Sequence, residues 1–247
     1  MQIQVDLERY RRQLLIEAIG KSGQQKLFDA KVLVCGAGGL GGPALTYLAA
    51  AGVGNIGLCD FDVIEPSNLN RQILYNCKDI KKSKAHIAKK KLKKFNPDVK
   101  IKIYPEKLTE ENISDILKNY DVVIDAVDNF KSRYLINRAA YKSFIPLVCG
   151  AVCELEGILT VIIPKENTSC LQCIYPIKPS TELTSKVFGI LGAIAGIIGS
   201  LQALETIKFI LGLQHHCLKN KILIFNGIEN TYRIRTTSKR KNCPVCR

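Results

Sequence analysis

A glycine-rich segment is the first part of the chain whose residue types could do chemistry. Gly36, Gly38 and Gly41 form a G-x-G-x-x-G pattern between the apolar block VLVC and the segment LGGPALTYLAAAG, which is typical of a helix. Backbone N–H groups of such a loop can approach a phosphate, and a helix N-terminus favours negative charge. Asp60 follows Gly41 by nineteen residues and could accept hydrogen bonds from ribose hydroxyl groups. The pattern predicts a site for NAD, FAD or ATP, with a ligand-free tight turn as the alternative.

Polar and cationic residues cluster after Asp60. Asn68, Arg71 and Gln72 lie in the segment DFDVIEPSNLNRQILY, and Lys84 follows Arg71 by thirteen residues. An arginine fork and a lysine ammonium on one loop could neutralise a triphosphate, which a dehydrogenase does not require. The cluster therefore favours ATP, and a surface ion-pair network is the alternative.

Acidic residues stand at the end of a further apolar segment, VVIDAVDNF. In doubly wound sheets ligands bind at the carboxyl ends of the strands, where Asp125, Asp128 and Asn129 would lie. We expect Asp125 to have a structural role, as a cap of the next segment. A carboxylate at Asp128 is suited to hold magnesium.

Four cysteines form two C-x-x-C pairs, Cys170 with Cys173 and Cys243 with Cys246. Two such pairs can supply the four thiolates of a tetrahedral zinc site. The 69 residues between the pairs are far more than a zinc ribbon contains, so a redox dithiol and two unrelated pairs remain alternatives.

The elements that must position these residues alternate between strands and helices. This alternation predicts an α/β fold with a Rossmann-like, doubly wound, mostly parallel sheet and helices on both faces. After residue 150 the pattern predicts a partly antiparallel C-terminal extension that carries the cysteine pairs. The expected strands are 31–35, a strand that ends at Asp60, 100–104, 121–126, 146–149, 157–163, 221–225 and 232–235. The expected helices are 7–18, 40–52, 82–95, 109–118, 130–142 and a glycine-rich helix around 187–204.

Length and composition fit one globular domain of 247 residues. We divide it into an N-terminal helical arm (1–30), a nucleotide-binding part (31–150) and a partner-binding and metal-binding part (151–247). The net charge of +14 is concentrated in residues 78–102 and 233–247. The first of these basic runs keeps a helical apolar stripe and is interpreted as a solvated helix face, with an acidic partner or RNA as the alternative.

Neither the N-terminus nor the most apolar run indicates a membrane protein. The opening MQIQVDLERYRRQ has no apolar core of a signal peptide, which predicts a reducing cytoplasm and free cysteines. The uncharged run 187–204 is diluted by glycines and followed by Glu205 and Lys208, so it is interpreted as a buried or interface helix.

Taken together, these motifs resemble the ThiF/MoeB/HesA family of ubiquitin-activating-like adenylyltransferases. The resemblance rests on their order along nearly the whole chain: RYRRQ (9–13), GAGGLGG (36–42), DFD (60–62), SNLNRQ (67–72), Lys84, DAVDN (125–129), CLQC and CPVC. It implies an enzyme that uses ATP to adenylate the C-terminal Gly-Gly carboxylate of a small ubiquitin-like sulfur-carrier protein, with release of pyrophosphate.

The resemblance also implies roles for individual residues. Gly39 and Asp60 would bind the adenosine end of ATP, the loop from Ser67 to Arg71 and Lys84 would meet the phosphates, and Asp128 would hold Mg²⁺. Arg12 resembles an arginine that reaches into the site of a partner subunit, so a homodimer is implied, and the four cysteines resemble structural zinc ligands. The expected nucleotide-binding set is Gly36, Gly38, Gly39, Gly41, Asp60, Asp62, Ser67, Asn68, Leu69, Asn70, Arg71, Gln72, Lys84, Asp128 and Asn129, and the expected catalytic set is Arg12, Arg71, Lys84 and Asp128.

One departure from the family pattern concerns sulfur transfer. Sulfur-handling members of the ThiF type place a cysteine twelve residues after the second zinc cysteine, where this chain has Ser185. A hydroxyl group cannot form a persulfide, and the chain ends at Arg247 without an attached rhodanese-like segment. We therefore expect a separate persulfide donor, a cysteine desulfurase or a rhodanese.

The sequence leaves the carrier open. The segments GQQKL, QILY, NPD and CPVC favour the thiazole-synthesis (ThiS) type, which we prefer, whereas Ser185 and CELEG favour the molybdopterin-synthase (MoaD) type. Alternative functions are a tRNA threonylcarbamoyladenosine dehydratase-like adenylating enzyme, an NAD-dependent Rossmann oxidoreductase and a non-catalytic scaffold. Neither a nucleic acid nor a membrane is an expected partner.

Overall fold

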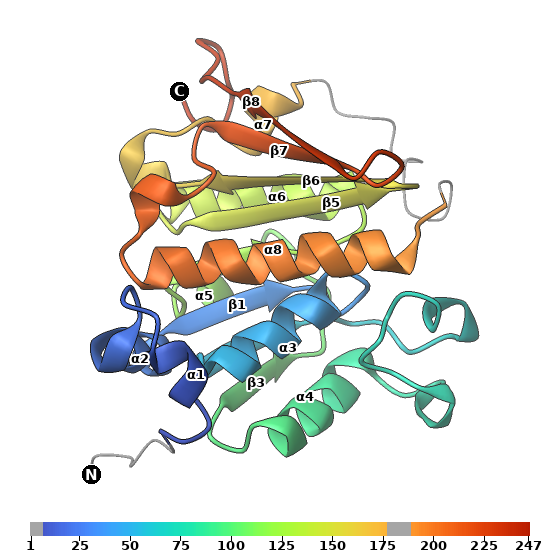
Figure 1. Ribbon diagram of the computed structural model, residues 1–247. Helices are drawn as coiled ribbons and strands as arrows, with labels where there is room; N and C mark the ends of the chain where they lie inside the picture. The colour runs from blue at the N-terminus through green and yellow to red at the C-terminus, as the bar shows by residue number, and fades with distance from the viewer. Residues whose placement is uncertain (1–6, 177–188) are drawn as a thin grey trace.

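One eight-stranded sheet forms the centre of the protein, in the order β3-β2-β1-β4-β5-β6-β7-β8 (Figure 1). The computed structural model describes residues 7–176 and 189–247. The pairs among β3, β2, β1, β4 and β5 are parallel, and those from β5 to β8 are antiparallel, which confirms the expected mostly parallel sheet with an antiparallel extension. The strands are β1 (Lys31–Cys35), β2 (Asn55–Cys59), β3 (Lys100–Tyr104), β4 (Val122–Asp125), β5 (Leu147–Cys153), β6 (Glu156–Ile162), β7 (Lys221–Asn226) and β8 (Thr231–Thr236).

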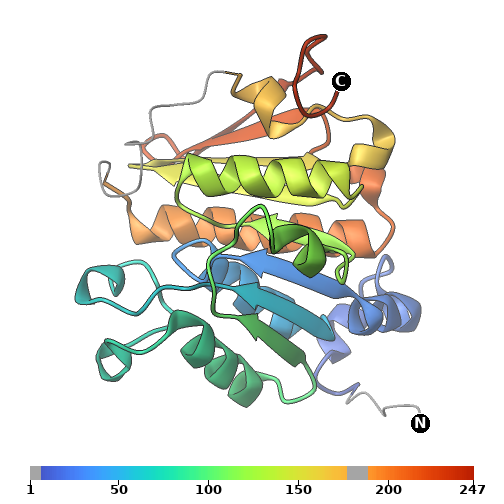
Figure 2. The ribbon, with the colours of Figure 1, turned by 180° about the vertical axis from the view of Figure 1, so that it is seen from behind.

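Helices cover both faces of this sheet, as expected for a doubly wound fold. Helices α3, α4 and α8 lie on one face (Figure 1), and α5, α6 and α7 lie on the other (Figure 2). The helices are α1 (Arg11–Leu14), α2 (Gly20–Asp29), α3 (Gly41–Ala51), α4 (Lys84–Phe95), α5 (Ile113–Leu117), α6 (Phe130–Lys142), α7 (Leu171–Ile174) and α8 (Gly192–Ile210). Single 3₁₀ turns are η1 (Pro66–Asn68), η2 (Cys77–Asp79), η3 (Pro164–Glu166) and η4 (Gln214–His216).

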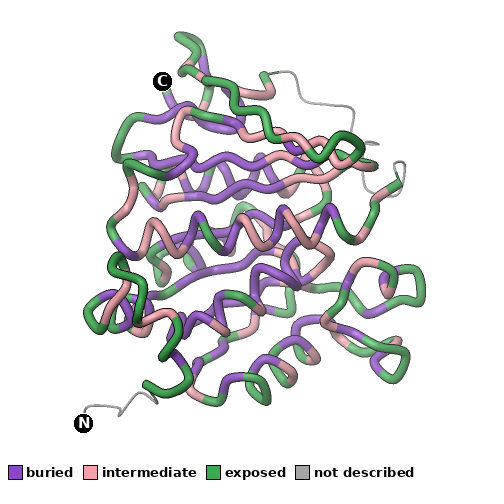
Figure 3. Tube along the Cα trace, viewed as in Figure 1, coloured by how far each residue is buried: buried purple, intermediate pink, exposed green. Residues whose placement is uncertain are grey.

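The hydrophobic core has two layers because successive side chains of a strand point to opposite faces of the sheet. In β1, Val32 and Val34 pack in the cluster beneath α3 and α8, whereas Leu33 packs in the cluster beneath α5 and α6. All three side chains are fully buried, and the buried segments run along the sheet in Figure 3. The run VLVC therefore reads as continuously apolar, as parallel strands buried on both faces do.

The prediction of a single N-terminal helix over residues 7–18 is wrong. Helix α1 ends at Leu14, and α2 begins at Gly20, whose φ of +50° interrupts a right-handed helix. Tertiary contacts decide the path instead: Tyr10 is buried and its hydroxyl bonds Asn96 Nδ2 at 2.9 Å, while Gln13 Nε2 donates to Ala51 O at 2.9 Å. The helix expected over 109–118 is also shorter, at Ile113–Leu117.

Helix α8 is the glycine-rich helix expected from the sequence. Among the described residues it is the one helix long and apolar enough to span a membrane by length and composition. In this structure Ile194 and Ile198 pack in the core beneath β5 and β6. A Cβ at Gly199 would lie 2.3 Å from Leu40 O, so this glycine lets α8 approach the start of α3 closely. The placement fits a core helix better than a membrane span.

The glycine loop after β1 generates a test of the packing. A Cβ at Gly41 would lie 1.8 Å from Gly36 O, which is backbone and cannot move aside cheaply. We expect Gly41→Ala to lower the free energy of unfolding by about 1–3 kcal/mol, the usual cost of overpacking, as measured by urea denaturation.

Gly196 provides the matched control because it lies within α8 and a Cβ there would meet no atom within 4 Å. Gly196→Ala should leave the free energy of unfolding unchanged or raise it by up to about 1 kcal/mol. Equal urea midpoints for the two variants would contradict the packing argument.

Candidate active site

A cavity of about 480 Å³ lies beside the glycine loop, at the carboxyl ends of β1, β2 and β4. This is the edge at which open α/β sheets bind ligands. The predicted site residues that line it are Gly36, Gly38, Gly39, Asp60, Asp62, Arg71, Gln72, Lys84, Asp128 and Asn129. The structure thus gathers most of the predicted nucleotide-binding residues around one space.

The glycine loop forms one wall of the cavity. Gly36 has a φ of +101°, and its N–H donates to Cys59 O at 2.8 Å, which fixes the loop to the end of β2. Helix α3 begins at Gly41, directly after the loop, so its N-terminus lies at this edge of the sheet. Gly39 faces Ala195 and Arg71, since a Cβ there would lie 3.2 Å and 3.5 Å from atoms of these side chains.

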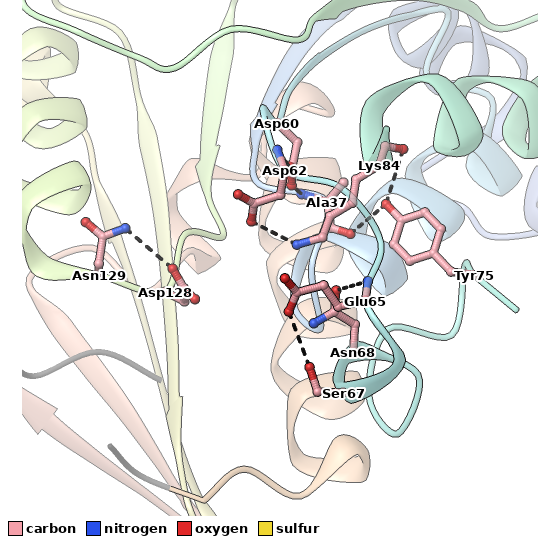
Figure 4. A network of polar contacts seen from close by, with 10 residues as sticks. All are labelled: Ala37, Asp60, Asp62, Glu65, Ser67, Asn68, Tyr75, Lys84, Asp128 and Asn129. Carbon is pink, nitrogen blue, oxygen red and sulfur yellow. Dashed lines mark hydrogen bonds and ion pairs between the residues drawn. The ribbon is translucent and has the colours of Figure 1, made fainter. Parts of the chain in front are cut away.

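Asp60 joins the glycine loop to the segment after β2. Its Oδ2 accepts a hydrogen bond from Ala37 N at 2.7 Å, and its Oδ1 accepts one from Asp62 N at 2.9 Å (Figure 4). Burial raises the pKa of Asp60, and the nearby Lys84 partly offsets this. Each carboxylate oxygen keeps a second lone pair, so the group can still accept a hydroxyl hydrogen from a ligand.

Lys84 is a buried cation at the first turn of α4. Its side chain is 7% exposed, and its Nζ lies 2.9 Å from Asp62 Oδ2. Ser83 caps the helix by accepting from His86 N, which sets where α4 begins. Tyr75 Oη donates to Ala37 O at 2.9 Å and approaches Lys84 O at 3.4 Å. Burial raises the pKa of Tyr75, so this hydroxyl remains a donor.

Arg71 is held at the cavity by the loop that precedes it. Its Nη1 donates to Ser67 O at 2.9 Å and to Asn70 Oδ1 at 3.0 Å. Asn68 closes the turn before it by accepting from Glu65 N at 3.1 Å. Of the described residues in this loop, Arg71 and Gln72 line the cavity, whereas Ser67, Asn68, Leu69 and Asn70 form the turn behind them.

Asp125 and Asp128 take different positions on the opposite side. Asp125 is fully buried, where its Oδ2 lies 3.0 Å from Arg133 Nη1 and its Oδ1 accepts from Val127 N at 3.2 Å. Burial raises its pKa, and Arg133 counteracts the shift. Asp128 lies at the cavity, where Asn129 Nδ2 approaches its Oδ1 at 3.4 Å and Asn129 caps α6. Asp125 is therefore structural, as the sequence predicted, but it acts through Arg133 and Val127, and the cap of α6 is Asn129 rather than Asp125.

Arg12 lies away from this cavity. The neighbouring Gln13 bonds Ala51 at the last residue of α3, whereas the cavity lies at the first residue of that helix. Eleven helical residues separate the two ends by about 16 Å. Arg12 is not among the residues that line the cavity.

A second, more apolar cavity of about 310 Å³ adjoins the first. Both are lined by Leu40, Val127, Asp128, Asn129 and Val152. Cys153 also lines this second cavity and is exposed, whereas Cys35, Cys59 and Cys149 are buried. Ser185, which the sequence singled out, lies outside the described residues.

The four predicted zinc ligands come together in space. Cys170 Sγ lies 3.5 Å from Cys243 Sγ, Cys173 Sγ lies 3.2 Å from Cys246 Sγ, and all four sulfur atoms lie within 4.8 Å of one another. A tetrahedron of sulfurs around zinc has edges of about 3.8 Å, given Zn–S bonds of about 2.3 Å. The donor set and its geometry therefore fit Zn²⁺, and the two pairs are not unrelated.

Some cavity residues were given no role from the sequence, among them Phe61, which lies inside the DFD motif, and residues 106–108, which lie in no motif. Phe61, although 57% exposed, follows Asp60 at the cavity, and Lys107 Nζ lies 5.8 Å from the centre of its ring. Glu106 and Leu108 lie on the same segment after β3. Only the pairing of β3 with β2 brings residues 106–108 next to Asp60, so no local pattern could identify them.

Comparisons with known proteins identify the family of this chain. The ThiF family model matches residues 10–245. A sulfur carrier protein adenylyltransferase of Thermus thermophilus is 40% identical over 250 residues, covering 98% of this chain and 91% of that relative. An adenylyltransferase and sulfurtransferase MOCS3 of Drosophila virilis is 44% identical over 244 residues, covering 98% of this chain and 54% of the relative, so the chain spans about half its length.

Solved structures agree on the fold. The crystal structure of E. coli MccB with ATP matches with a TM-score of 0.78 and 24% identity, covering 91% of this chain and 68% of that chain. The crystal structure of PaaA matches with a TM-score of 0.76 and 24% identity, covering 96% and 75%. Because the family match and the 40% identity extend over nearly the whole chain, the protein belongs to the ThiF family.

Proposed function

We propose that this protein uses ATP to adenylate the C-terminal carboxylate of a ubiquitin-like sulfur-carrier protein that ends in Gly-Gly. The observation that carries the proposal is the convergence of Arg71, Lys84, Asp60 and Asp128 on one cavity beside the glycine loop. The Thermus relative, an adenylyltransferase of a sulfur carrier protein, supports the choice of substrate.

The chemistry requires charge neutralisation more than proton transfer. The carboxylate of the carrier is ionised at neutral pH and needs no general base. Its oxygen attacks the α-phosphorus of ATP, a new P–O bond forms, and the bond to pyrophosphate breaks. Arg71 and Lys84 offset the repulsion between the anion and the polyanion and stabilise the charge that moves to pyrophosphate. The loop from Ser67 to Arg71 and Gly39 position the nucleotide in this scheme.

The apolar second cavity offers a path for the carrier's tail. It adjoins the nucleotide cavity and shares lining residues with it, among them Asp128 and Val152. A Gly-Gly end has no side chains, so it can enter a narrow passage and bring its carboxylate next to the α-phosphate. Because the carboxylate and ATP would then be bound next to each other, the reaction would proceed as if it were intramolecular.

Two metal ions belong to the proposal. The Asp128 carboxylate would hold Mg²⁺ at the cavity, where the ion would neutralise charge on the phosphate oxygens. The cluster of Cys170, Cys173, Cys243 and Cys246 would hold Zn²⁺, which would cross-link α7 to the C-terminal segment. We assign the zinc a structural role because four thiolates leave no open coordination position.

Arg12 supports a homodimer with shared sites. It precedes Gln13, which bonds Ala51 at the far end of α3, and it does not line its own cavity. We therefore assign Arg12 to the site of a second copy, where its guanidinium would add positive charge near the phosphates.

The sulfur itself would come from another protein. This chain has Ser185 where sulfur-handling members of the ThiF type place a cysteine, and a hydroxyl group cannot form a persulfide. We propose that the chain supplies the adenylation step, and that a cysteine desulfurase or a rhodanese supplies the persulfide in the cytoplasm. The pathway served is thiazole or molybdopterin synthesis, with the thiazole type preferred on the segments GQQKL, QILY, NPD and CPVC.

The first test is exchange of labelled pyrophosphate into ATP. We expect exchange only with a carrier that ends in Gly-Gly, and Lys84→Ala or Arg71→Ala should lower its rate by about 10²–10³-fold because each removes a cation that stabilises developing charge. Lys90→Ala, on the exposed face of the same helix, is the control and should exchange at the wild-type rate. Carrier-independent reduction of NAD without ATP binding would contradict the proposal.

Removal of zinc should destabilise the fold without touching the nucleotide cavity. We expect the purified protein to contain one zinc per chain, and a chelator or Cys243→Ser should lower the melting temperature, measured by calorimetry. Cys77→Ser alters an exposed cysteine outside the cluster and should leave both zinc content and melting temperature unchanged. Full zinc content in Cys243→Ser would contradict this ligand set.

Subunit mixing tests the role of Arg12. Arg12→Ala and Lys84→Ala homodimers should each be inactive, but equal mixing with subunit exchange creates one intact site in each heterodimer. We expect recovery of about a quarter of the wild-type exchange rate, since half of the dimers are mixed and each has one working site of two. If Arg12 acted within its own chain, no activity would return.

A further inference from the structure

The ion pair between Asp62 and Lys84 is asymmetric in burial. The side chain of Lys84 is 7% exposed, whereas that of Asp62 is 51% exposed, and the two charged atoms lie 2.9 Å apart. A buried ammonium group is costly unless a partner compensates it. The carboxylate of Asp62 is therefore the solvent-exposed partner of a buried ammonium group, and both residues line the cavity.

Backbone contacts fix both members of the pair relative to the glycine loop. Lys84 N donates to Asp62 O at 3.0 Å, so the two residues are joined through main chain as well as side chains. Asp62 N donates to Asp60 Oδ1, and Asp60 Oδ2 accepts from Ala37 N in the glycine loop. The hydroxyl of Tyr75 donates to Ala37 O and also approaches Lys84 O, so it connects the two segments. The network seen in Figure 4 thus couples the ammonium position to the loop.

A direct role of Asp62 as a nucleotide ligand fits this geometry poorly. Its carboxylate would face the anionic oxygens of a triphosphate, and like charges at short range repel. Its Oδ2 already accepts from Lys84 Nζ. Asp60, not Asp62, has its carboxylate bonded to the glycine loop, which is where a ribose would be recognised.

We propose that Asp62 is a positioning residue that aims Lys84 at the phosphates before ATP binds. This inference rests on the proposed adenylation. An ammonium group has three N–H donors, so Lys84 can keep one hydrogen bond to Asp62 and give the others to phosphate oxygens. The flexible four-carbon stem of lysine loses conformational entropy when its ammonium group is fixed. Asp62 fixes the group before ATP binds, so this entropy loss does not weaken ATP binding.

The test is a double-mutant cycle of Asp62→Ala and Lys84→Ala, read in pyrophosphate exchange and in ATP binding by calorimetry. With Lys84 present, Asp62→Ala should lower kcat by about 10-fold or more and weaken ATP binding several-fold. In the Lys84→Ala background the same change should cause no further loss, and ATP should bind equally well or more tightly, because an uncompensated carboxylate has been removed. Asp62→Glu keeps the charge and should recover part of kcat.

The controls separate positioning from a general loss of structure. Asp115→Ala breaks another aspartate–lysine pair, with Lys118 at 2.6 Å on the surface, and should leave kcat, KM and ATP affinity unchanged. An equal fold-loss from Asp62→Ala in both backgrounds would overturn the inference, since Asp62 would then act independently of Lys84.

Failure of the proposed function would look different. If no Gly-Gly carrier supported exchange by the wild-type chain, the adenylation proposal would fail. The ATP affinities of the wild-type protein, the two single variants and the double variant would still decide whether Asp62 acts through Lys84, because ATP binding requires no carrier.

Discussion

A hydrogen-bonded ion-pair network at the carboxyl edge of the sheet is the feature on which the site depends. It runs from Ala37 through Asp60 and Asp62 to Lys84 and places a nearly buried ammonium beside an open cavity. A cation in that position can bind a polyanionic ligand strongly, because electrostatic interactions in a desolvated site are stronger than in water. The glycine loop, the turn that holds Arg71 and the start of α4 all serve this placement.

The two halves of the sheet have separate tasks. The parallel half brings the ends of β1, β2 and β4 to one edge and so assembles the nucleotide cavity. The antiparallel half supplies the apolar second cavity and carries the segment that leads to the cysteine cluster. Helix α8 packs against strands of both halves, β4, β5 and β6. Its Gln202 Nε2 donates to Asp125 O of β4 at 2.7 Å and to Val148 O of β5 at 3.2 Å. One buried polar side chain of α8 thus satisfies carbonyl groups of β4 and β5.

Local sequence patterns predicted much of the fold. The strand over 31–35 and the helix over 130–142 have the predicted bounds, because continuous apolar runs and helical periodicity are local signals. Tertiary contacts overrode the pattern at the N-terminus, where buried Tyr10 and its bond to Asn96 fix a broken helix. The extension of β5 to Cys153 depends on its pairing with β6, which the local pattern did not reveal.

The chain alone determined which residue types are present for chemistry: the glycine spacing, Asp60, Arg71, Lys84, Asp128 and two cysteine pairs. It could not decide that cysteines 69 residues apart share one cluster, that Phe61 and Lys107 meet, or that Asp62 pairs with Lys84. Spacing reports only what neighbouring residues can do, whereas these contacts form when distant strands pair and side chains are buried together. The sequence therefore specified the functional groups, and tertiary packing set the distances between them.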